Sequence, residues 1–176
     1  MLKIINSAFM SLDGVTADPG SWAIFDPDSG QEAAQVMQAL DGMLMGRGTY
    51  EYFADVTPQQ TGPYADAINA IRKYVFSSTL ESADWNNSTI IRGDVVTAVN
   101  DLKQQDGGDL MIYGHGRLSK TLLEHHLVDE IRFSIHPLLV CAVAAGGSGN
   151  KLPLELLATV SSANGVVALT YQPAAR

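Results

Sequence analysis

Apolar residues recur along this chain either in short continuous runs or at helical spacing. Segments of the two kinds alternate, which predicts strands and helices that follow one another. Residues 2–12 and 110–113 are short, almost unbroken apolar runs, which are typical of strands buried on both faces. In segments such as residues 31–40, apolar positions return every three or four residues, as in a helix with one buried face. This alternation predicts an α/β domain built on a mostly parallel sheet.

The same patterns divide the whole chain, whose 176 residues are compatible with a single domain over residues 1–176. The predicted strands are residues 2–12, 42–45, 73–77, 89–91, 110–113 and 128–139. The predicted helices are residues 31–40, 64–71, 94–103 and the segments that follow Gly48 and Arg117. A loop is predicted for residues 16–30, a small-residue connection for 140–150, and a terminal hairpin for 154–160 with 166–171.

Two glycine-containing turns lead from a predicted strand into a predicted helix. They are Gly46-Arg47-Gly48-Thr49 and Gly114-His115-Gly116-Arg117-Leu118. Free backbone N–H groups and the positive end of the helix dipole favour an anion at such a helix start. We expect Thr49 to cap the first helix and Arg47 to add a fixed positive charge. Each turn alone could be a plain connection, whereas two in one domain favour a nucleotide.

The second of these turns is not a complete dinucleotide fingerprint, because Ser119 stands where the third glycine would be. Three hydroxyl residues, Ser77, Ser78 and Thr79, directly follow another predicted strand. Hydroxyls in this position can bond a phosphate or a ribose, or they can cap a turn.

The residues after the first predicted strand supply further candidates for a ligand site. Asp13 and Gly14 form a turn signal, and Asp13 is either a turn residue that bonds its own backbone or a carboxylate facing a ligand. Trp22 and Phe25, in loop 16–30, form a wall for a flat ligand or pin the loop to the core.

Charge and cysteine content narrow the range of partners. The formal net charge of −8 argues against a nucleic-acid or anionic-membrane surface, while a local basic pocket for a phosphate stays compatible with it. The single cysteine, Cys141, stands among apolar residues and is expected to be a buried, inert thiol. Without a disulfide, a signal peptide or a membrane span, the chain is expected to be cytoplasmic. The four histidines have no metal-ligand spacing, so we expect no metal site.

Five segments carry a resemblance that covers the whole chain. They are Ser11-Leu12-Asp13-Gly14, Met45-Gly46-Arg47-Gly48-Thr49-Tyr50-Glu51, Val75-Phe76-Ser77-Ser78-Thr79, Ile112-Tyr113-Gly114-His115-Gly116-Arg117-Leu118 and Leu127-Val128-Asp129-Glu130-Ile131. In order and spacing the chain resembles the pyrimidine reductases of riboflavin biosynthesis and their stand-alone relatives, in the dihydrofolate-reductase-like superfamily. The resemblance implies a three-layer α/β fold with a mostly parallel twisted central sheet, helices on both faces and an antiparallel C-terminal hairpin. It also implies a homodimer.

The resemblance implies NADPH as the cofactor, held by the turns described above. The implied contacts are Gly14, Gly46, Arg47, Gly48 and Thr49; Ser77, Ser78, Thr79 and Arg92 at the adenosine ribose and its extra phosphate; and Gly114, His115, Gly116, Arg117 and Leu118 around the pyrophosphate. The expected activity is that of an NADPH-dependent reductase similar to 5-amino-6-(5-phosphoribosylamino)uracil reductase.

By the same resemblance, Asp13 places or supplies the proton that the reduced product needs. As a general acid at neutral pH it would need a raised pKa, or it would act through water. Trp22, Phe25 and Glu32 are the implied contacts of a small-molecule substrate.

Helix 31–40 departs from the pyrimidine reductases, because it has no Lys, Arg or His where they grip the ribose phosphate of their substrate. Folate reductases place a carboxylate on this helix, and Glu32 is present. A weak dihydrofolate reductase, a reductase of a pterin or a quinone, and a nucleotide-binding module without turnover therefore stay open as alternatives.

Overall fold

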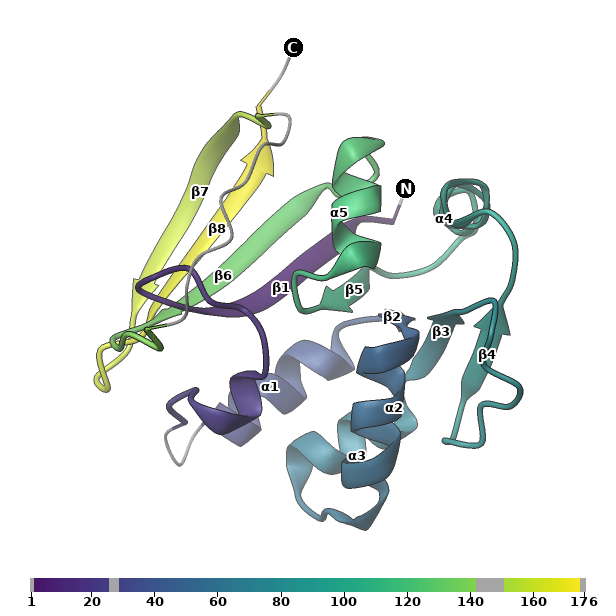
Figure 1. Ribbon diagram of the computed structural model, residues 1–176, viewed down its shortest axis with the longest axis horizontal. Coiled ribbons are helices and arrows are strands. Elements are labelled where there is room, and N and C mark those ends of the chain that lie inside the picture. Colours follow the sequence, from purple (N-terminus) through teal and green to yellow (C-terminus); the bar gives the residue numbers. More distant parts are fainter. Residues whose placement is uncertain (1, 26–28, 142–150, 175–176) are drawn as a thin grey trace.

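A computed structural model describes residues 2–25, 29–141 and 151–174 of the chain, and its centre is one eight-stranded sheet (Figure 1). The strand order is β4-β3-β2-β5-β1-β6-β8-β7. The strands are β1 (Ile4–Ser11), β2 (Gly42–Gly46), β3 (Arg72–Phe76), β4 (Ser88–Ile91), β5 (Leu110–Tyr113), β6 (Glu130–His136), β7 (Leu154–Ser161) and β8 (Val167–Pro173). From β4 to β6 all neighbouring strands are parallel, whereas β8 is antiparallel to both β6 and β7.

Helices cover both faces of this sheet. They are α1 (Ser29–Gln38), α2 (Arg47–Val56), α3 (Pro63–Ala70), α4 (Val95–Lys103) and α5 (Arg117–Glu124), with short 3-10 turns at Pro19–Ser21 and Thr57–Gln59. Because strand side chains alternate between faces, neighbouring residues enter different cores. Ile4 packs with residues of α4 and α5, and Ile5 packs with residues of α1, α2 and α3. The predicted three-layer fold is confirmed, with α1, α2 and α3 on one side of the sheet and α4 and α5 on the other (Figure 1).

The predicted elements are present, with changes at their ends. The first helix begins at Ser29 rather than Gln31, and β6 is an interior strand that ends one residue before Pro137. The terminal hairpin is confirmed as β7 and β8. Most of the predicted connection 140–150 lies outside the described residues. Across the residues that the structure describes, every helix is too short or too polar to cross a membrane.

The prediction that Thr49 caps α2 is wrong. The cap is Gly46, whose backbone is extended (φ −76°, ψ 163°), and Arg47 is already helical. The chain therefore passes from β2 into α2 without an intervening turn, and Gly46 itself has no side chain to bond the first free N–H groups.

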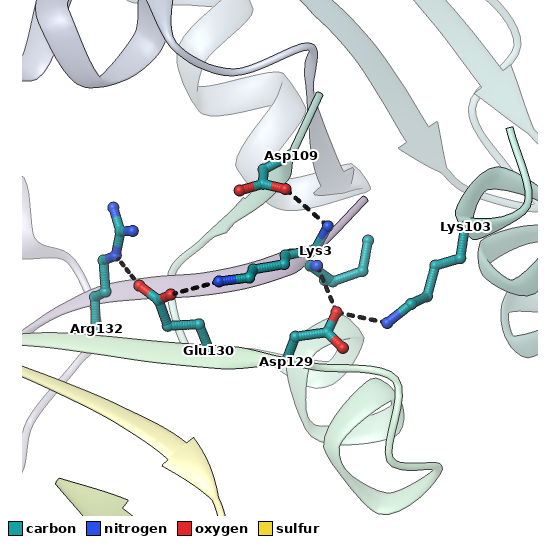
Figure 2. A network of polar contacts seen from close by, with 7 residues as sticks. Lys3, Lys103, Asp109, Asp129, Glu130 and Arg132 are labelled. Atoms are coloured by element: carbon teal, nitrogen blue, oxygen red, sulfur yellow. Dashed lines mark hydrogen bonds and ion pairs between the residues drawn. The ribbon is translucent and has the colours of Figure 1, made fainter. Parts of the chain in front are cut away.

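Charged residues pin the amino ends of the central strands, at what we name the amino edge of the sheet (Figure 2). The Asp129 carboxylate accepts hydrogen bonds from the Ile4 backbone N–H at 2.7 Å and from the Lys103 ammonium. Glu130 lies between Arg132, at 2.6 Å, and Lys3, at 3.9 Å. The segment Leu127–Ile131, which contributes to the family resemblance, thus joins β1, β6 and α4 and has a structural role.

The opposite, carboxyl edge carries the turns that follow β1 to β6. After β1 the chain crosses to the face covered by α1, whereas after β5 it crosses to the face covered by α5. Adjacent strands whose connections leave toward opposite faces define a topological switch point, which is where open α/β sheets bind ligands. By this definition β5 forms a switch point with both of its neighbours, β1 and β2, and all the turns singled out in the sequence lie along this edge.

Candidate functional site at the carboxyl edge of the sheet

Two arginines meet the hydroxyl residues that follow β3, in the segment Ser77–Leu80 that we name the hydroxyl turn. Arg47 Nη1 donates to Thr79 Oγ1 at 3.1 Å. Arg92, from the end of β4, donates to the carbonyl oxygens of Ser78 at 3.2 Å and Leu80 at 2.7 Å. The structure thus brings together the predicted residues of three separate strand ends.

Within the hydroxyl turn, Ser77 has the turn-capping role. Its Oγ accepts hydrogen bonds from the backbone N–H groups of Thr79, at 3.2 Å, and Leu80, at 3.0 Å. Ser78 and Thr79 are exposed. Arg47 is also exposed and lies 3.6 Å from Glu51, in an ion pair of the kind that contributes little to stability. Both exposed guanidinium groups can therefore turn toward an incoming anion.

The turn after β5 is anchored by a fully buried amide, Asn6 of β1. Asn6 Nδ2 donates to the Gly114 carbonyl at 2.7 Å and to the Ile112 carbonyl at 3.4 Å. Asn6 Oδ1 lies 3.2 Å from His115 Nδ1. Because Oδ1 can only accept, the network assigns the proton of a neutral imidazole to Nδ1 and leaves Nε2 as an acceptor. Burial lowers the pKa of His115, and the nearby Lys120 lowers it further, so the ring is neutral at pH 7.

At the starts of α2 and α5, three glycines are required neither by a left-handed backbone nor by close packing. Gly46 and Gly116 have ordinary negative φ angles of −76° and −93°, and Gly48 is inside the first turn of α2. A Cβ atom built on any of the three would meet no atom within 4 Å beyond its chain neighbours and the backbone of its own helix. By contrast, Gly114, at φ +85°, needs the left-handed conformation that glycine tolerates. Glycines that the fold does not require are typical of places where a ligand approaches the backbone.

The remaining residues of the second turn divide between surface and core. Arg117 is exposed at the first position of α5, where its side chain can reach along the edge. Leu118 is half-buried and packs against the core shared with α4. Leu118 therefore anchors the turn to the core.

Asp13, the predicted catalytic residue, closes the end of β1 onto the segment that follows β6. Its carboxylate accepts hydrogen bonds from the Ser11 hydroxyl at 2.6 Å and from the backbone N–H groups of Val140, at 3.1 Å, and Cys141, at 2.8 Å. These donors, with Ser11 contributing most, lower the pKa of Asp13. The carboxylate is therefore ionised at neutral pH, which is the opposite of what direct proton donation requires, and action through water is the route that stays open. The neighbouring Gly14 is at φ +84°, and its N–H bonds the Ser11 carbonyl.

The prediction of a buried Cys141 is wrong. Cys141 is exposed and has a left-handed backbone with φ 58°. The Asp13 carboxylate accepts a hydrogen bond from its backbone N–H, beyond the end of β6 at His136.

Trp22 and Phe25 join an aromatic cluster with Phe9 of β1 and His136 of β6. The His136 ring contacts Phe9 and Trp22 edge to face, at centroid distances of 5.0 and 5.6 Å, and Phe25 lies 5.7 Å from Phe9. His136 is buried, its Nδ1 accepts the Ile24 N–H at 3.0 Å, and burial lowers its pKa. Trp22 packs against His136 and pins the loop to the sheet, whereas Phe25 stays largely exposed. Glu32 is exposed in the first turn of α1.

Two residues that contribute to this edge, Asn6 and His136, are not among the predicted site residues. Each bonds a segment distant in sequence, and Asn6 is 108 residues from Gly114. For Asn6 a signal exists, since a lone amide inside a fully apolar strand run needs a buried partner.

The fold and the turns of its carboxyl edge define an α/β domain of the dihydrofolate-reductase-like class. The chain belongs to the RibD C-terminal domain family, which matches residues 2–168. Two Bacillus subtilis relatives are the uncharacterized proteins YyaP, 29% identical over 96% of this chain and 94% of its own length, and YwjB, 28% identical over 84% and 80%.

Solved structures with this fold include proteins named for riboflavin biosynthesis. A putative riboflavin biosynthesis protein from Shewanella sp. PV-4 is similar with a TM-score of 0.76 and 21% identity, covering 99% of this chain and 100% of the other. A diaminohydroxyphosphoribosylaminopyrimidine deaminase/5-amino-6-(5-phosphoribosylamino)uracil reductase from Thermotoga maritima is similar with a TM-score of 0.67 and 14% identity, covering 98% of this chain and 57% of that protein. The fold is thus that of the reductase-like domain of this pathway.

Proposed function

We propose that this protein is an NADPH-dependent reductase that transfers a hydride to a small ring compound. The observation that carries the proposal is the set of three glycines, Gly46, Gly48 and Gly116, which the fold does not require. They lie at the starts of α2 and α5, where free backbone N–H groups and helix dipoles favour phosphate. Two such starts on one sheet edge suit a ligand that carries several phosphates.

The cations of the edge support NADPH as that ligand. Arg47 and Arg92 flank the hydroxyl turn and would hold the adenosine ribose with its extra phosphate. The turn Gly114–Leu118, anchored by Asn6, would hold the pyrophosphate. These groups follow β2, β3, β4 and β5, which leaves the ends of β1 and β6 for the reacting ring.

When bound, NADPH supplies the hydride, and the protein supplies position and exclusion of water. The aromatic cluster of Phe9, Trp22, Phe25 and His136 forms an apolar wall beside the end of β1. The ionised Asp13 is fixed at the same strand end and would hold a water that delivers the proton to the reduced product.

Calorimetric titration of the protein with NADPH and, separately, with NADH tests this function. We expect micromolar binding of NADPH and at least about tenfold weaker binding of NADH, because the extra phosphate adds charged hydrogen bonds. Absence of binding for both nucleotides would contradict the proposal.

A further inference from the structure

Lys73, the second residue of β3, is a fully buried cation that the proposed chemistry does not use. Its Nζ donates hydrogen bonds to the backbone carbonyl oxygens of Ile71 at 2.8 Å, Asn86 at 2.9 Å and Asn69 at 3.0 Å. The Trp85 ring lies against the same Nζ, 4.2 Å from the ring centroid. No carboxylate in the described part of the chain forms an ion pair with it. Because lysine is almost never fully buried without a charged partner, this arrangement needs an explanation.

The partners of Nζ match the protonated form of this lysine. Burial lowers the pKa of Lys73 to about 8, so at pH 7 Nζ is still an ammonium group with three N–H donors for three carbonyl oxygens. Two of these oxygens lie at the carboxyl end of α3, where the helix dipole favours a cation. We name Nζ, the three carbonyl oxygens and the Trp85 ring the ammonium cage. The cage joins α3, β3 and the segment before β4.

The ammonium cage holds one end of the connection between β3 and β4, residues 77–87, and the hydroxyl turn is the other end. Trp85 Nε1 donates to Asn69 Oδ1 at 2.7 Å, which is a second bond between this connection and α3. Leu80, the last residue of the hydroxyl turn, packs against the core cluster that contains Trp85 and Tyr50. The hydroxyl turn and the ammonium cage therefore share one packed core.

Helix α2 is tied to the same place. The Trp85 backbone N–H donates to Tyr50 Oη at 3.0 Å, and Tyr50 lies about one turn after Arg47 on α2. Arg47 in turn donates to Thr79 of the hydroxyl turn at 3.1 Å. Trp85 thus links Lys73 both to the helix that carries Arg47 and to the segment that carries Thr79.

We propose that Lys73 is a positioning residue that sets the preference of this site for NADPH over NADH. The inference rests on the proposed function, since it concerns the residues proposed to hold the extra phosphate of NADPH. Without the ammonium group, three buried carbonyl oxygens lose their donor, and the end of the connection at Trp85 shifts. Arg47 and the hydroxyl turn then lose their relative placement. NADH, which lacks the extra phosphate, does not depend on that placement.

The ratio of the NADH to the NADPH dissociation constant, measured by calorimetry, tests this role. Lys73→Met keeps the length of the side chain but removes the ammonium group, and we expect the ratio to fall at least about fivefold. Lys103→Met is the matched control, because Lys103 Nζ also donates to a backbone carbonyl, that of Leu127 at 3.3 Å, but at the amino edge. It should lower stability and leave the ratio unchanged.

Chemical rescue separates the charge from the packing. In Lys73→Ala the missing atoms are those of propylammonium, which should restore the ratio, whereas 1-propanol, with one donor and no charge, should not. Equal rescue by both compounds would overturn the role of the ammonium group.

Tyr50→Phe removes only the hydroxyl that joins α2 to Trp85, so it tests the same link even where a Lys73 variant does not fold. We expect it to lower the ratio as well. A ratio that stays at the unmodified value in Tyr50→Phe or in folded Lys73→Met overturns this inference and leaves the proposed cofactor in place. Failure of the unmodified protein to bind NADPH, or equal binding of both nucleotides, counts against the proposed function and this inference together.

Discussion

Asn6 Nδ2 donates a 2.7 Å hydrogen bond to the carbonyl oxygen of Gly114, and this bond ties the centre of β1 to the turn that begins α5. Replacing Asn6 with Leu keeps the side-chain size but leaves a buried carbonyl without its donor. We expect this variant to lose about 1–3 kcal/mol of stability in urea unfolding. It should also bind NADPH more weakly, because the turn is no longer held. Asn100→Leu, on the exposed face of α4, is the control and should change neither quantity.

Arg47 offers the most direct electrostatic test of the proposed NADPH site. Arg47→Ala should weaken NADPH binding by about 1.5–3 kcal/mol, the value of a charged hydrogen bond. Arg72→Ala removes the same charge from the opposite end of the neighbouring strand, where the Arg72 side chain donates to Tyr74 Oη, and should leave the affinity unchanged. Equal affinities for all three proteins in calorimetry would remove Arg47 from the site.

Asp13 makes stability depend on pH in a defined direction. Its pKa in the folded protein lies below the ordinary value of 3.8, so its stabilising effect is complete above that value and is lost as the pH falls through the lowered pKa. Asp13→Asn should therefore unfold at a lower temperature than the unmodified protein at pH 7, and the difference should close in strong acid. Asp18→Asn, in the same loop, provides the control. A gap that stays constant with pH would show that ionised Asp13 does not hold the strand ends together.

The edge strand β7 supports the expected homodimer. All eight of its residues are exposed, including Leu156, Leu157 and Val160, and its outer backbone groups lie at the edge of the described sheet. Two copies related by a two-fold axis could pair these strands. We expect a dimer in sedimentation velocity, dissociation with Leu157→Lys, and no change with Tyr52→Lys on α2. A monomer at every concentration tested would contradict this arrangement.

Much of the fold could be predicted because a buried strand shows its burial in the apolar pattern of its own residues. The continuous apolar run of β1 indicates a central strand, and the structure places it between β5 and β6. The helix start at Gly46 and the turn at Gly114 could be found because a glycine between an apolar run and a helical pattern is visible in the sequence itself. Their meeting along one edge follows from parallel strands, whose carboxyl ends coincide.

The residues that could not be predicted act through partners that the strand and helix pattern does not identify. Lys73 looks like an ordinary strand residue, yet its buried Nζ donates to the carbonyl oxygens of Asn69, Ile71 and Asn86 and lies 4.2 Å from the Trp85 ring. The exposure of Cys141 could not be predicted either, because apolar neighbours in sequence do not tell where Asp13 fixes the backbone.

Gly48 allows the central claim, that the carboxyl-edge turns hold the phosphates of NADPH, to be tested by one comparison. Gly48→Ala adds a methyl group to a helix where no atom beyond the chain neighbours and the helix backbone lies within 4 Å, so it should raise stability by up to about 1 kcal/mol. If a phosphate lies against this backbone, the same methyl should weaken NADPH binding at least about tenfold. Gly30→Ala, in the first turn of α1 and equally free of contacts, should leave NADPH binding unchanged. The decisive measurement is the NADPH dissociation constant of Gly48→Ala: a tenfold rise in a stable protein is the predicted result, and an unchanged value would contradict the account.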